Sequence, residues 1–481
     1  MTHINNNLVK FIGDRAIVIG GSIAGLLSAR VLADYFEKVI IIDRDKLPKT
    51  PRSRIGVPQS VQPHVLFTKG YRIIGELFPG IEECLAANGA ITIDWAREFK
   101  HYVEGNWGLT TEQPSDIVSV TCSRYLLEWT IRQELHKLPR ISFIEQSKVT
   151  GLLYDAVSDK VTGVCLQSAA PLNGDLIVDA SGRSSQASQW LKEVGVAPIP
   201  ETVVNPFLGY ATRRYRLPDR DTDWKVLLIS QTPPKDTRLG YLAKIENNEL
   251  IATLGGYAKD FPPLDEGGFL GFARSLAQPD FYQTIVNATP TSPIYAHRAT
   301  TNRLRNYDKI KLPSGFVTLG DAVCALCPVY GQGMTISALG AKTLQAWLDK
   351  SQVNQLNNNR FQKQLAKNNS FHWMLATSQD ARFPATVGGK QSKGGVVDKL
   401  MTGYMNKLLI DILLSFHSQR SLKEEDSYEN LSPKEWVDSS QGVLTNSLQI
   451  QARLVQPLLC SHCLHNQHWL YNYSLFVDNK K

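Results

Sequence analysis

A glycine-rich turn between two short apolar runs limits what this chain can fold into more than any other feature. Residues 16–19 (Ala-Ile-Val-Ile) lead into Gly20-Gly21-Ser22-Ile23-Ala24-Gly25, and an unbroken helical stretch follows to Ala33. A second apolar run, residues 39–42, ends at Asp43. Strand, turn, helix and strand within about 30 residues form one βαβ unit with a right-handed crossover. The sequence therefore predicts an α/β fold that begins with this unit.

The turn also predicts a ligand, because it fits the fingerprint of dinucleotide-binding turns with Ser22 at the middle glycine position. Serine is small enough for the backbone to approach a pyrophosphate, and the helix N-terminus offers free N–H groups and partial positive charge. Asp43 can accept hydrogen bonds from both ribose hydroxyls. A tight core turn without a ligand is the alternative. One fingerprint near the start of a 481-residue chain favours tightly held FAD over NAD.

The composition excludes several classes of protein. Hydrophobic residues make up 43% and charged residues 20%, which is ordinary for a globular protein. Lys and Arg exceed Asp and Glu by 52 − 45 = 7, without a basic block that would bind nucleic acid, and this mild excess suits an anionic cofactor. No apolar run approaches the ~18 residues of a membrane span, and residues 1–7 are polar, unlike a secretory signal. With seven cysteines and no disulfide framework, we expect a cytoplasmic protein.

Changes in sequence texture divide the chain into four parts. Short alternating runs separated by turn residues, such as Glu249–Leu254, are typical of an antiparallel sheet and first appear after Gly195. Apolar strand sequence returns at Phe316, and polar helical sequence follows Leu348. The predicted parts are residues 1–194 (a Rossmann-like domain with an inserted segment at about 64–120), 195–298 (an antiparallel-sheet substrate domain), 299–350 (the end of the Rossmann-like domain) and 351–481 (a helical C-terminal region).

Two later motifs each follow a predicted strand. The first is Asp179-Ala180-Ser181-Gly182-Arg183-Ser184; the second is Gly320-Asp321-Ala322 with Pro328 and Gly331-Gln332-Gly333-Met334, which opens a helix. Together with the N-terminal turn, and in this order, they resemble the single-component (class A) FAD-dependent monooxygenases, the family that includes squalene epoxidase. The resemblance covers about residues 14–350.

Weaker resemblances point to branches of that family. Arg54-Ile55-Gly56 with Gln62-Pro63 resembles the flavin-contacting loop of the squalene-epoxidase branch. Ser123-Arg124 with Leu126 and Glu128 resembles the family's cofactor-binding arginine at a helix start. Residues 328–334 and 376–384 are similar to bacterial epoxidases and hydroxylases of secondary metabolism. Two positions depart from the family. Asp-Ala-Ser-Gly replaces Asp-Gly at 179–182, as in flavin halogenases and prenyl reductases, and Cys324 stands where a histidine is usual.

The resemblance implies a glutathione-reductase-like FAD-binding domain and a monooxygenase reaction. NADPH or NADH would reduce FAD, and a C4a-hydroperoxyflavin would transfer one oxygen atom from O2 to a small apolar substrate. The substrate would be a polyene, terpenoid, polyketide or aromatic compound, with epoxidation favoured over ring hydroxylation. No catalytic residue is implied, because the protein's part is to supply a dry pocket. A separate flavin reductase or a carrier protein stays open as a partner.

The resemblance also gives roles to individual residues. Asp321 would bind ribityl hydroxyls, and the backbone N–H groups of residues 331–334 would face the flavin O2/N1 edge. Asp179 would either lie near the pyrophosphate or order its own loop. The residues expected to bind the cofactor are Gly20, Gly21, Ser22, Ile23, Ala24, Gly25, Asp43, Arg44, Arg54, Arg124, Val149, Asp179, Gly320, Asp321, Pro328, Gly331, Gln332, Gly333 and Met334.

The sequence leaves other functions open and contains two cysteine pairs that could form further sites. A flavin halogenase is one alternative, although the chain has no Trp-x-Trp-x-Ile-Pro signature. A geranylgeranyl-reductase-like prenyl reductase and a flavin-binding redox sensor without turnover are the others. Cys324 and Cys327 have the spacing of a redox pair, but packing is the favoured interpretation. Cys460-Ser461-His462-Cys463 lacks a second ligand pair, so we predict no metal site.

Overall fold

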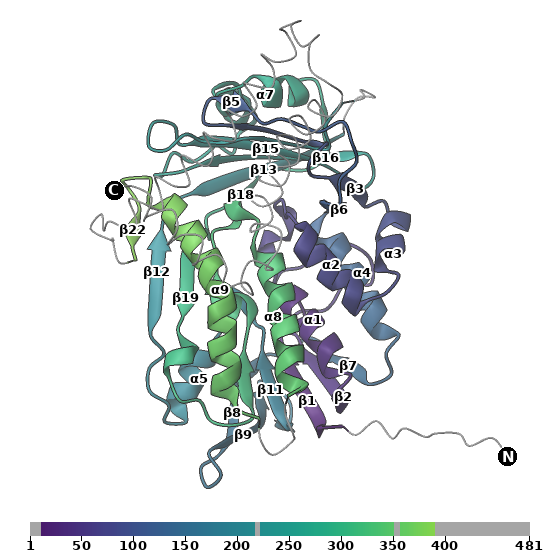
Figure 1. The fold of residues 1–481 in the computed structure, drawn as a ribbon, viewed down its shortest axis with the longest axis vertical. Helices are drawn as coiled ribbons and strands as arrows, with labels where there is room; N and C mark the ends of the chain where they lie inside the picture. The colour runs from purple at the N-terminus through teal and green to yellow at the C-terminus, as the bar shows by residue number, and fades with distance from the viewer. Residues whose placement is uncertain (1–10, 217–221, 351–355, 390–481) are drawn as a thin grey trace, which may run out of the picture. The chain divides into compact units, whose positions relative to one another are not determined.

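The computed structural model describes residues 11–216, 222–350 and 356–389. At its centre is a five-stranded sheet in the order β20-β11-β1-β2-β7 (Figure 1). Every neighbouring pair in this sheet is parallel. The strands are β1 (Gly13–Ile19), β2 (Phe36–Ile42), β7 (Ile141–Ile144), β11 (Leu176–Asp179) and β20 (Phe316–Thr318). The predicted α/β fold with a Rossmann-like parallel unit is thus confirmed.

Helices bury the apolar faces of this sheet, as its continuous apolar strands require. Helix α1 connects β1 to β2, and its side chains at Leu26 and Leu27 are fully buried. Helix α8 packs against α1, α2 and α9. The helices of this layer are α1 (Ile23–Leu32), α2 (Thr68–Leu77), α3 (Ile81–Ala87), α4 (Arg124–His136), α5 (Ala187–Glu193), α8 (Gly333–Leu348) and α9 (Asn358–Asp380).

Two small antiparallel sheets pack beside the parallel sheet. A meander in the order β10-β9-β8 contacts β11 through β9. A second sheet in the order β21-β19-β12-β22 connects distant parts of the chain. Their strands are β8 (Val149–Asp155), β9 (Lys160–Leu166), β10 (Leu172–Asn173), β12 (Glu201–Asn205), β19 (Asn302–Arg305), β21 (Cys324–Ala325) and β22 (Val387–Gly388).

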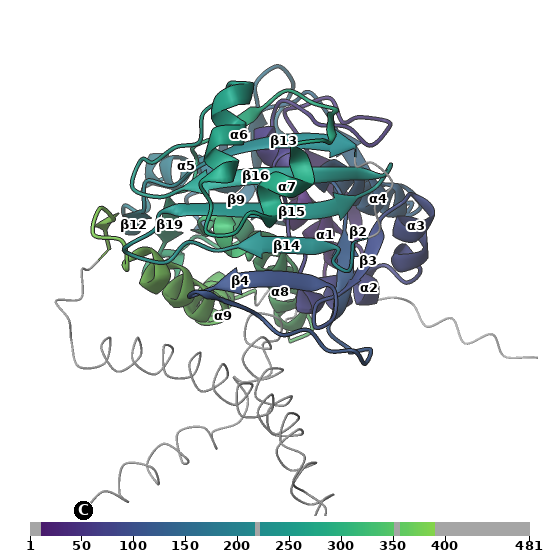
Figure 2. The same cartoon turned by 90° about the horizontal axis from the view of Figure 1, so that it is seen from above.

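A large, mainly antiparallel sheet forms a separate layer with its own core. Its main strands run in the order β17-β13-β16-β15-β14-β4-β5, with β18 paired to β13. Figure 2 shows β13, β16, β15, β14 and β4 of this sheet from above, and α6 (Glu266–Arg274) and α7 (Asp280–Ile285) pack on β16 and β15, respectively. The strands are β4 (Phe99–Val103), β5 (Asn106–Trp107), β13 (Gly209–Arg216), β14 (Val226–Ile229), β15 (Arg238–Ile245), β16 (Glu249–Gly256), β17 (Thr289–Pro290) and β18 (Tyr295–His297).

The structure differs from the sequence pattern between Ile91 and His101, which by pattern alone indicates one strand. Two strands occur there: β3 (Ile91–Asp94) pairs with β6 (Val118–Thr121), and β4 joins the large sheet beside β14. The Asp94 carboxylate accepts hydrogen bonds from the backbone N–H of Ala96 at 3.0 Å and of Ser115 at 2.7 Å. These bonds fix a turn inside the apolar run, so the chain changes sheets there.

Two sequence predictions about the C-terminal part can be compared with the structure only in part. Helix α9 supplies helical structure within residues 356–389, and the remainder of the predicted helical region, including Cys460 and Cys463, lies outside the described residues. Among the helices that the structure describes, none is long and apolar enough to cross a membrane.

Candidate functional site

The N-terminal turn is packed so closely that its first glycine cannot be replaced without strain. Gly20 has φ +105°, and a Cβ there would lie 2.7 Å from the Ala180 carbonyl oxygen. A Cβ on Gly25 would overlap the Gly20 carbonyl oxygen. Gly320, with φ +63°, lies so near α1 that its Cβ would be 2.8 Å from the Ala24 Cβ. The three motifs found in the sequence therefore meet at one place.

Asp43 ends β2 beside this turn and holds it closed. Its Oδ2 accepts a hydrogen bond from the Gly21 N–H at 2.7 Å, and its Oδ1 accepts from the Asp45 N–H at 2.8 Å and from Arg54 Nη1 at 3.1 Å. A carboxylate has about four lone-pair sites, so one site on Oδ2 stays available for a hydroxyl group. Asp43 thus lies where the sequence predicted, and it also orders the turn.

Buried charges surround the same turn. Arg54 forms ion pairs with Asp43 at 3.1 Å, Asp45 at 2.7 Å and Glu128 at 2.9 Å. Burial lowers the pKa of Arg54, but the facing Glu128 and Asp43 carboxylates outweigh it and raise that pKa. Burial raises the pKa of Glu128, but the positive charges of Arg124 and Arg54 outweigh burial. The pKa of Glu128 is therefore lowered overall. Arg54 and Glu128 therefore stay ionised at neutral pH.

Ser22 connects the turn to this charge cluster. Its Oγ donates to Glu128 Oε2 at 2.8 Å and accepts from Arg124 Nη2 at 2.8 Å. Arg124 Nη1 lies 3.1 Å from Glu128 Oε2 as an ion pair, but it has no well-aligned hydrogen-bond acceptor in the described part of the chain. The middle position of the fingerprint thus binds a buried arginine that keeps one donor group without a hydrogen-bond acceptor in the described part of the chain. An anion is the natural partner of such a donor.

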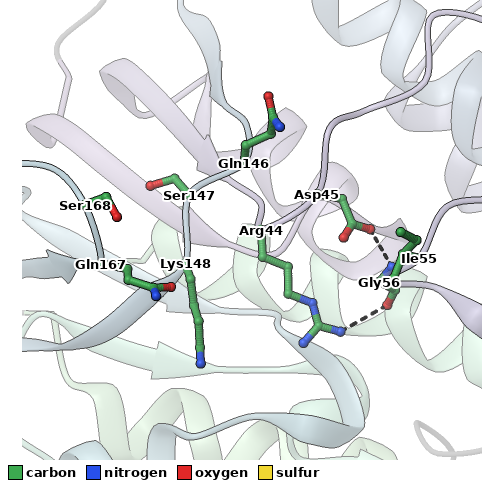
Figure 3. Close-up of a pocket in the computed structure, with 9 residues that line it drawn as sticks. All are labelled: Arg44, Asp45, Ile55, Gly56, Gln146, Ser147, Lys148, Gln167 and Ser168. Atoms are coloured by element: carbon green, nitrogen blue, oxygen red, sulfur yellow. Dashed lines mark hydrogen bonds between the residues drawn. The ribbon is translucent and has the colours of Figure 1, made fainter.

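A pocket of about 350 Å³ lies next to Asp43 (Figure 3). Arg44 reaches across it and donates from Nη2 to the Gly56 carbonyl oxygen at 3.4 Å. Figure 3 shows Lys148, which precedes Val149, on the opposite wall from Ile55. The pocket is lined by Arg44, Asp45, Ile55, Gly56, Gln146, Ser147, Lys148, Gln167 and Ser168.

The Gly-Asp motif places a carboxylate near the start of α8. Burial raises the pKa of Asp321, and the positive charges of Arg183 and Arg124 oppose this shift without cancelling it. Arg183 Nε lies 3.7 Å from Asp321 Oδ2. A Cβ on Gly333 would be 3.9 Å from Asp321 Oδ1. The Asp321 carboxylate thus lies beside the first turn of α8.

The N-terminus of α8 carries a buried amide that needs a partner. Gln332 is 1% exposed, and neither its Nε2 nor its Oε1 has a hydrogen-bond partner among residues 11–389 that the structure describes. Buried side-chain amides are normally hydrogen-bonded. Gly331, with φ +63°, is covered by Val65, whose Cβ would be 3.0 Å from an added Cβ. A polar ligand at this helix end would satisfy Gln332.

The Asp179 carboxylate, unlike that of Asp43, is fully occupied by neighbouring residues of the protein. It is fully buried, and its Oδ1 accepts from the Ser181 N–H at 3.0 Å and from Ser181 Oγ at 2.5 Å. Its Oδ2 accepts from Ser185 Oγ at 2.6 Å and lies 3.4 Å from Thr318 Oγ1. All four lone-pair sites are thus used by its surroundings, which favours the loop-ordering role that the sequence left open.

Comparison with known proteins identifies the family. No protein-family profile matches the chain. Protein Rv3254 of Mycobacterium tuberculosis (strain ATCC 25618 / H37Rv) is 31% identical over 345 residues, which is 69% of this chain and 72% of that protein. The chain belongs to the family of Protein Rv3254.

Solved structures with similar folds include flavoenzymes of two kinds. PqsL, a probable FAD-dependent monooxygenase from Pseudomonas aeruginosa, aligns with a TM-score of 0.54 and 14% identity, covering 77% of this chain and 98% of PqsL. The myxobacterial FAD-dependent halogenase CndH aligns with a TM-score of 0.58 and 15% identity, covering 81% of this chain and 90% of CndH. The 2-methyl-3-hydroxypyridine-5-carboxylic acid oxygenase aligns with a TM-score of 0.55 and 16% identity, covering 76% of this chain and 91% of the oxygenase. The chain has the fold shared by these FAD-dependent monooxygenases and halogenases.

Many residues predicted from the sequence lie around the place where the three motifs meet. Asp43, Arg54 and Arg124 form hydrogen bonds to the turn at 20–25. Gly320 lies beside Ala24, and Asp321 lies near Gly333 at the start of α8. Glu128 and Asp45 belong to the same charge cluster but were not among the predicted site residues. Glu128 belongs to the resemblance at the start of α4, although it was not given a binding role, and Asp45 is a single acidic residue in a loop. The signal for a role of both residues is that buried arginines need counter-charges nearby.

The two cysteines with the spacing of a redox pair lie in the core. Cys324 and Cys327 are both buried free thiols, as packing predicts. Trp224, which precedes β14, packs with Phe269 and Phe272 of α6 in the core of the large sheet. No group of three or more metal-binding side chains occurs in the part of the chain that the structure describes.

Proposed function

We propose that this protein is an FAD-dependent monooxygenase that transfers one oxygen atom of O2 to an apolar organic substrate, with epoxidation favoured over ring hydroxylation. The observation that carries the proposal is that two helix N-termini, those of α1 and α8, meet at the Gly-Asp turn. In the described part of the chain, no N-cap side chain accepts a hydrogen bond from the first N–H groups of either helix. Two such ends suit a ligand with two negative regions.

We propose that these donor and acceptor groups bind FAD. The N–H groups at the start of α1 and the spare Nη1 of Arg124 would hold the pyrophosphate. Asp43 would accept a ribose hydroxyl at its remaining lone pair, and the pocket between Arg44 and Lys148 would receive the adenine. We propose the same adenine contact for Val149, which follows Lys148 in the chain.

The other end of the site would hold the flavin ring. Asp321 would bind ribityl hydroxyls, and the Gln332 amide and the N–H groups of residues 331–334 would face the ring edge. Bound FAD would supply the redox chemistry, taking two electrons from NADPH or NADH and passing them to O2. The start of α8 would stabilise negative charge on the ring edge, because its N–H groups are fixed and partly positive.

The apolar surroundings support an apolar substrate. Val65 and Phe67 pack with Tyr241 in one cluster, and Val329 packs with Tyr210 in another. Both clusters adjoin the segment that leads into α8, and such side chains exclude water. Burial lowers the pKa of His64, which precedes Val65, to about 3, so this imidazole is neutral there. We propose that the antiparallel sheet of residues 195–298 covers the substrate and that the protein works in the cytoplasm.

A flavin halogenase is the second candidate. Two observations favour it: the Asp-Ala-Ser-Gly sequence at 179–182 resembles that of halogenases, and the fold is shared with CndH. The two reactions differ in their need for a halide, because a halogenase has no activity without one.

An anaerobic spectrum tests the proposal. The purified protein, with FAD added if needed, is mixed with NADPH or NADH under nitrogen and then exposed to air. A flavin band that bleaches and returns, followed by a product 2 mass units heavier when 18O2 replaces 16O2, supports a self-sufficient monooxygenase. Halide-dependent product formation with no label from 18O2 would favour the halogenase. Absence of flavin binding at saturating FAD would overturn both.

A further inference from the structure

The C-terminal end of α9 carries a carboxylate that nothing in the proposed chemistry uses. Asp380 is fully buried. Its Oδ1 accepts a hydrogen bond from the Tyr330 hydroxyl at 2.5 Å, and its Oδ2 accepts from Asn302 Nδ2 at 2.6 Å. The Tyr257 hydroxyl lies 3.4 Å from Oδ1. Asp380 forms no ion pair with any residue that the structure describes.

These bonds hold both ends of a short segment. Tyr330 ends the turn η5 (Pro328–Tyr330), and Asp380 binds it directly. At the other end, Asn302 Oδ1 accepts from the Cys327 N–H at 2.7 Å, so Asp380 reaches Cys327 through Asn302. The next residue after Tyr330 is Gly331, where the chain turns into α8. The start of α8 is therefore fixed from a helix that lies outside the three motifs.

Asp380 is itself held rigidly. Its carbonyl oxygen accepts from Thr386 Oγ1 at 2.6 Å. Phe383, one turn further on, stacks on Tyr257 with ring centroids 4.2 Å apart and planes 15° from parallel. A carboxylate that faces neutral donors alone is an unfavourable way to stabilise a core. Short hydrogen bonds in a water-free site do, however, define one geometry.

We propose that Asp380 is a positioning residue that fixes residues 327–334 against the flavin ring. The proposal rests on the proposed function, because it assumes that FAD binds at the start of α8. Asp380 would not touch the cofactor. It would act through Tyr330 and Asn302, whose hydrogen bonds set the place of Gln332 and of the N–H groups beyond it.

The protonation of Asp380 gives the arrangement a pH dependence. Burial raises the pKa of Asp380 to about 6, although the hydrogen bonds from Tyr330, Asn302 and Tyr257 lower it. The titratable groups around it are Tyr330, Tyr257, Tyr210 and Cys327, and burial raises the pKa of each well above its ordinary value. These four groups stay neutral between pH 5 and 8, so Asp380 is the member of this described cluster that changes charge.

Protonation would weaken the hold on the segment. Asn302 cannot turn its amide round, because its Oδ1 already accepts from the Cys327 N–H. A proton on Oδ2 of Asp380 would face the Asn302 amide hydrogens, and a proton on Oδ1 would compete with the Tyr330 hydroxyl. The environment of the flavin should therefore change as the pH falls through about 6.

A swap of two side chains tests the proposal. Asp380→Asn alone places its amide hydrogens against those of Asn302. When Asp380→Asn is combined with Asn302→Asp, the new amide at 380 donates to the new carboxylate at 302, so the hydrogen bond between the two positions is restored with its direction reversed. The swap gives up only the long contact from Asn302 Nδ2 to the Val204 carbonyl oxygen at 3.4 Å. Asp94→Asn is the matched control, because Asp94 is also buried and hydrogen-bonded but lies in the β3 turn.

Three quantities are measured for each protein: the Kd for FAD from quenching of flavin fluorescence, the midpoint potential of the bound flavin, and its visible spectrum between pH 5 and 7.5. Asp380→Asn should weaken FAD binding about tenfold, which corresponds to losing one buried hydrogen bond, and should shift the midpoint potential. It should also abolish the spectral change near pH 6. The swap should restore the Kd to within about threefold of wild type, a difference well under one hydrogen bond. Asp94→Asn should leave all three quantities unchanged.

Other outcomes separate the two proposals. If Asp380→Asn binds FAD with the Kd, potential and pH dependence of wild type, the positioning role is refuted while FAD binding stands. A swap variant that binds as poorly as the single variant also refutes it, even if the single variant fails to fold, because the swap retains the hydrogen bonds. A wild-type protein that binds no FAD would instead overturn the proposed function.

Discussion

Replacing Gly20 by alanine tests the packing of the three motifs directly. Gly20 has φ +105°, and an alanine there is strained by about 1–2 kcal/mol whatever its neighbours. Its Cβ would also lie 2.7 Å from the Ala180 carbonyl oxygen and 3.0 Å from the Ser181 Cα. Ordinary contact begins at 3.4 Å, so Ala180 must retreat by 3.4 − 2.7 = 0.7 Å. Such overpacking costs about 1–3 kcal/mol more.

Gly195→Ala is the matched control, because Gly195 has φ +90° but no atom within 4 Å of an added Cβ. Both variants carry the backbone strain, and the difference between them isolates the steric part. Urea denaturation of the apoprotein should show Gly20→Ala to be less stable than Gly195→Ala by about 1–3 kcal/mol. The displaced turn should also lose about two phosphate hydrogen bonds, weakening FAD binding by roughly 10- to 100-fold. Equal stability and equal FAD affinity in the two variants would refute the packing argument.

Three further results are expected. Arg54→Met leaves Asp43, Asp45 and Glu128 without their shared cation, so the free energy of unfolding from urea titration should fall by about 3–5 kcal/mol; a fall under about 1 kcal/mol would contradict the account. Gln332→Met removes a buried amide that has no hydrogen-bond partner in the described part of the chain, so the free energy of unfolding of the apoprotein should rise by about 1–2 kcal/mol. FAD binding should weaken about tenfold. A less stable apoprotein would contradict the absence of a partner for this amide. The pKa of Asp380 is raised to about 6 from 3.8, so the folded state holds the proton more tightly than the unfolded chain. The free energy of unfolding of wild type, relative to that of Asp380→Asn, should therefore fall by up to about 3 kcal/mol as the pH rises from about 4 to 6. Urea titrations of both proteins at each pH measure this difference, and a difference that rises with pH would contradict the raised pKa.

The parts of the fold that sequence could predict are those specified by short stretches of chain. The turn at 20–25 lies between two buried strands, and each glycine there meets a neighbour that leaves no room for a side chain. The start of α8 is equally local, because Gly331 to Met334 leads straight into an apolar helix. Backbone geometry at such places depends on residues within one or two turns.

Long-range pairing escaped sequence analysis for a physical reason. Strand β4 lies beside β14, more than a hundred residues further along the chain, and an alternating pattern does not say which edge a strand joins. The same holds for the contact between Asp380 and Asn302: residues 376–384 carry a family resemblance, but the sequence does not say that Asp380 meets Asn302. The signal for Asp380 was an acidic residue on the buried face of α9, in register with His372 and Ala376.

Binding of FAD to the apoprotein is the measurement that tests the central claim most directly. The account predicts that a titration followed by flavin absorbance saturates at one FAD per chain, and that Gly20→Ala weakens this binding while Gly195→Ala does not. Saturation at one equivalent with that contrast would support a single FAD site built on the turn at 20–25 and the start of α8. No binding at saturating FAD, or binding that Gly20→Ala leaves unchanged, would contradict it.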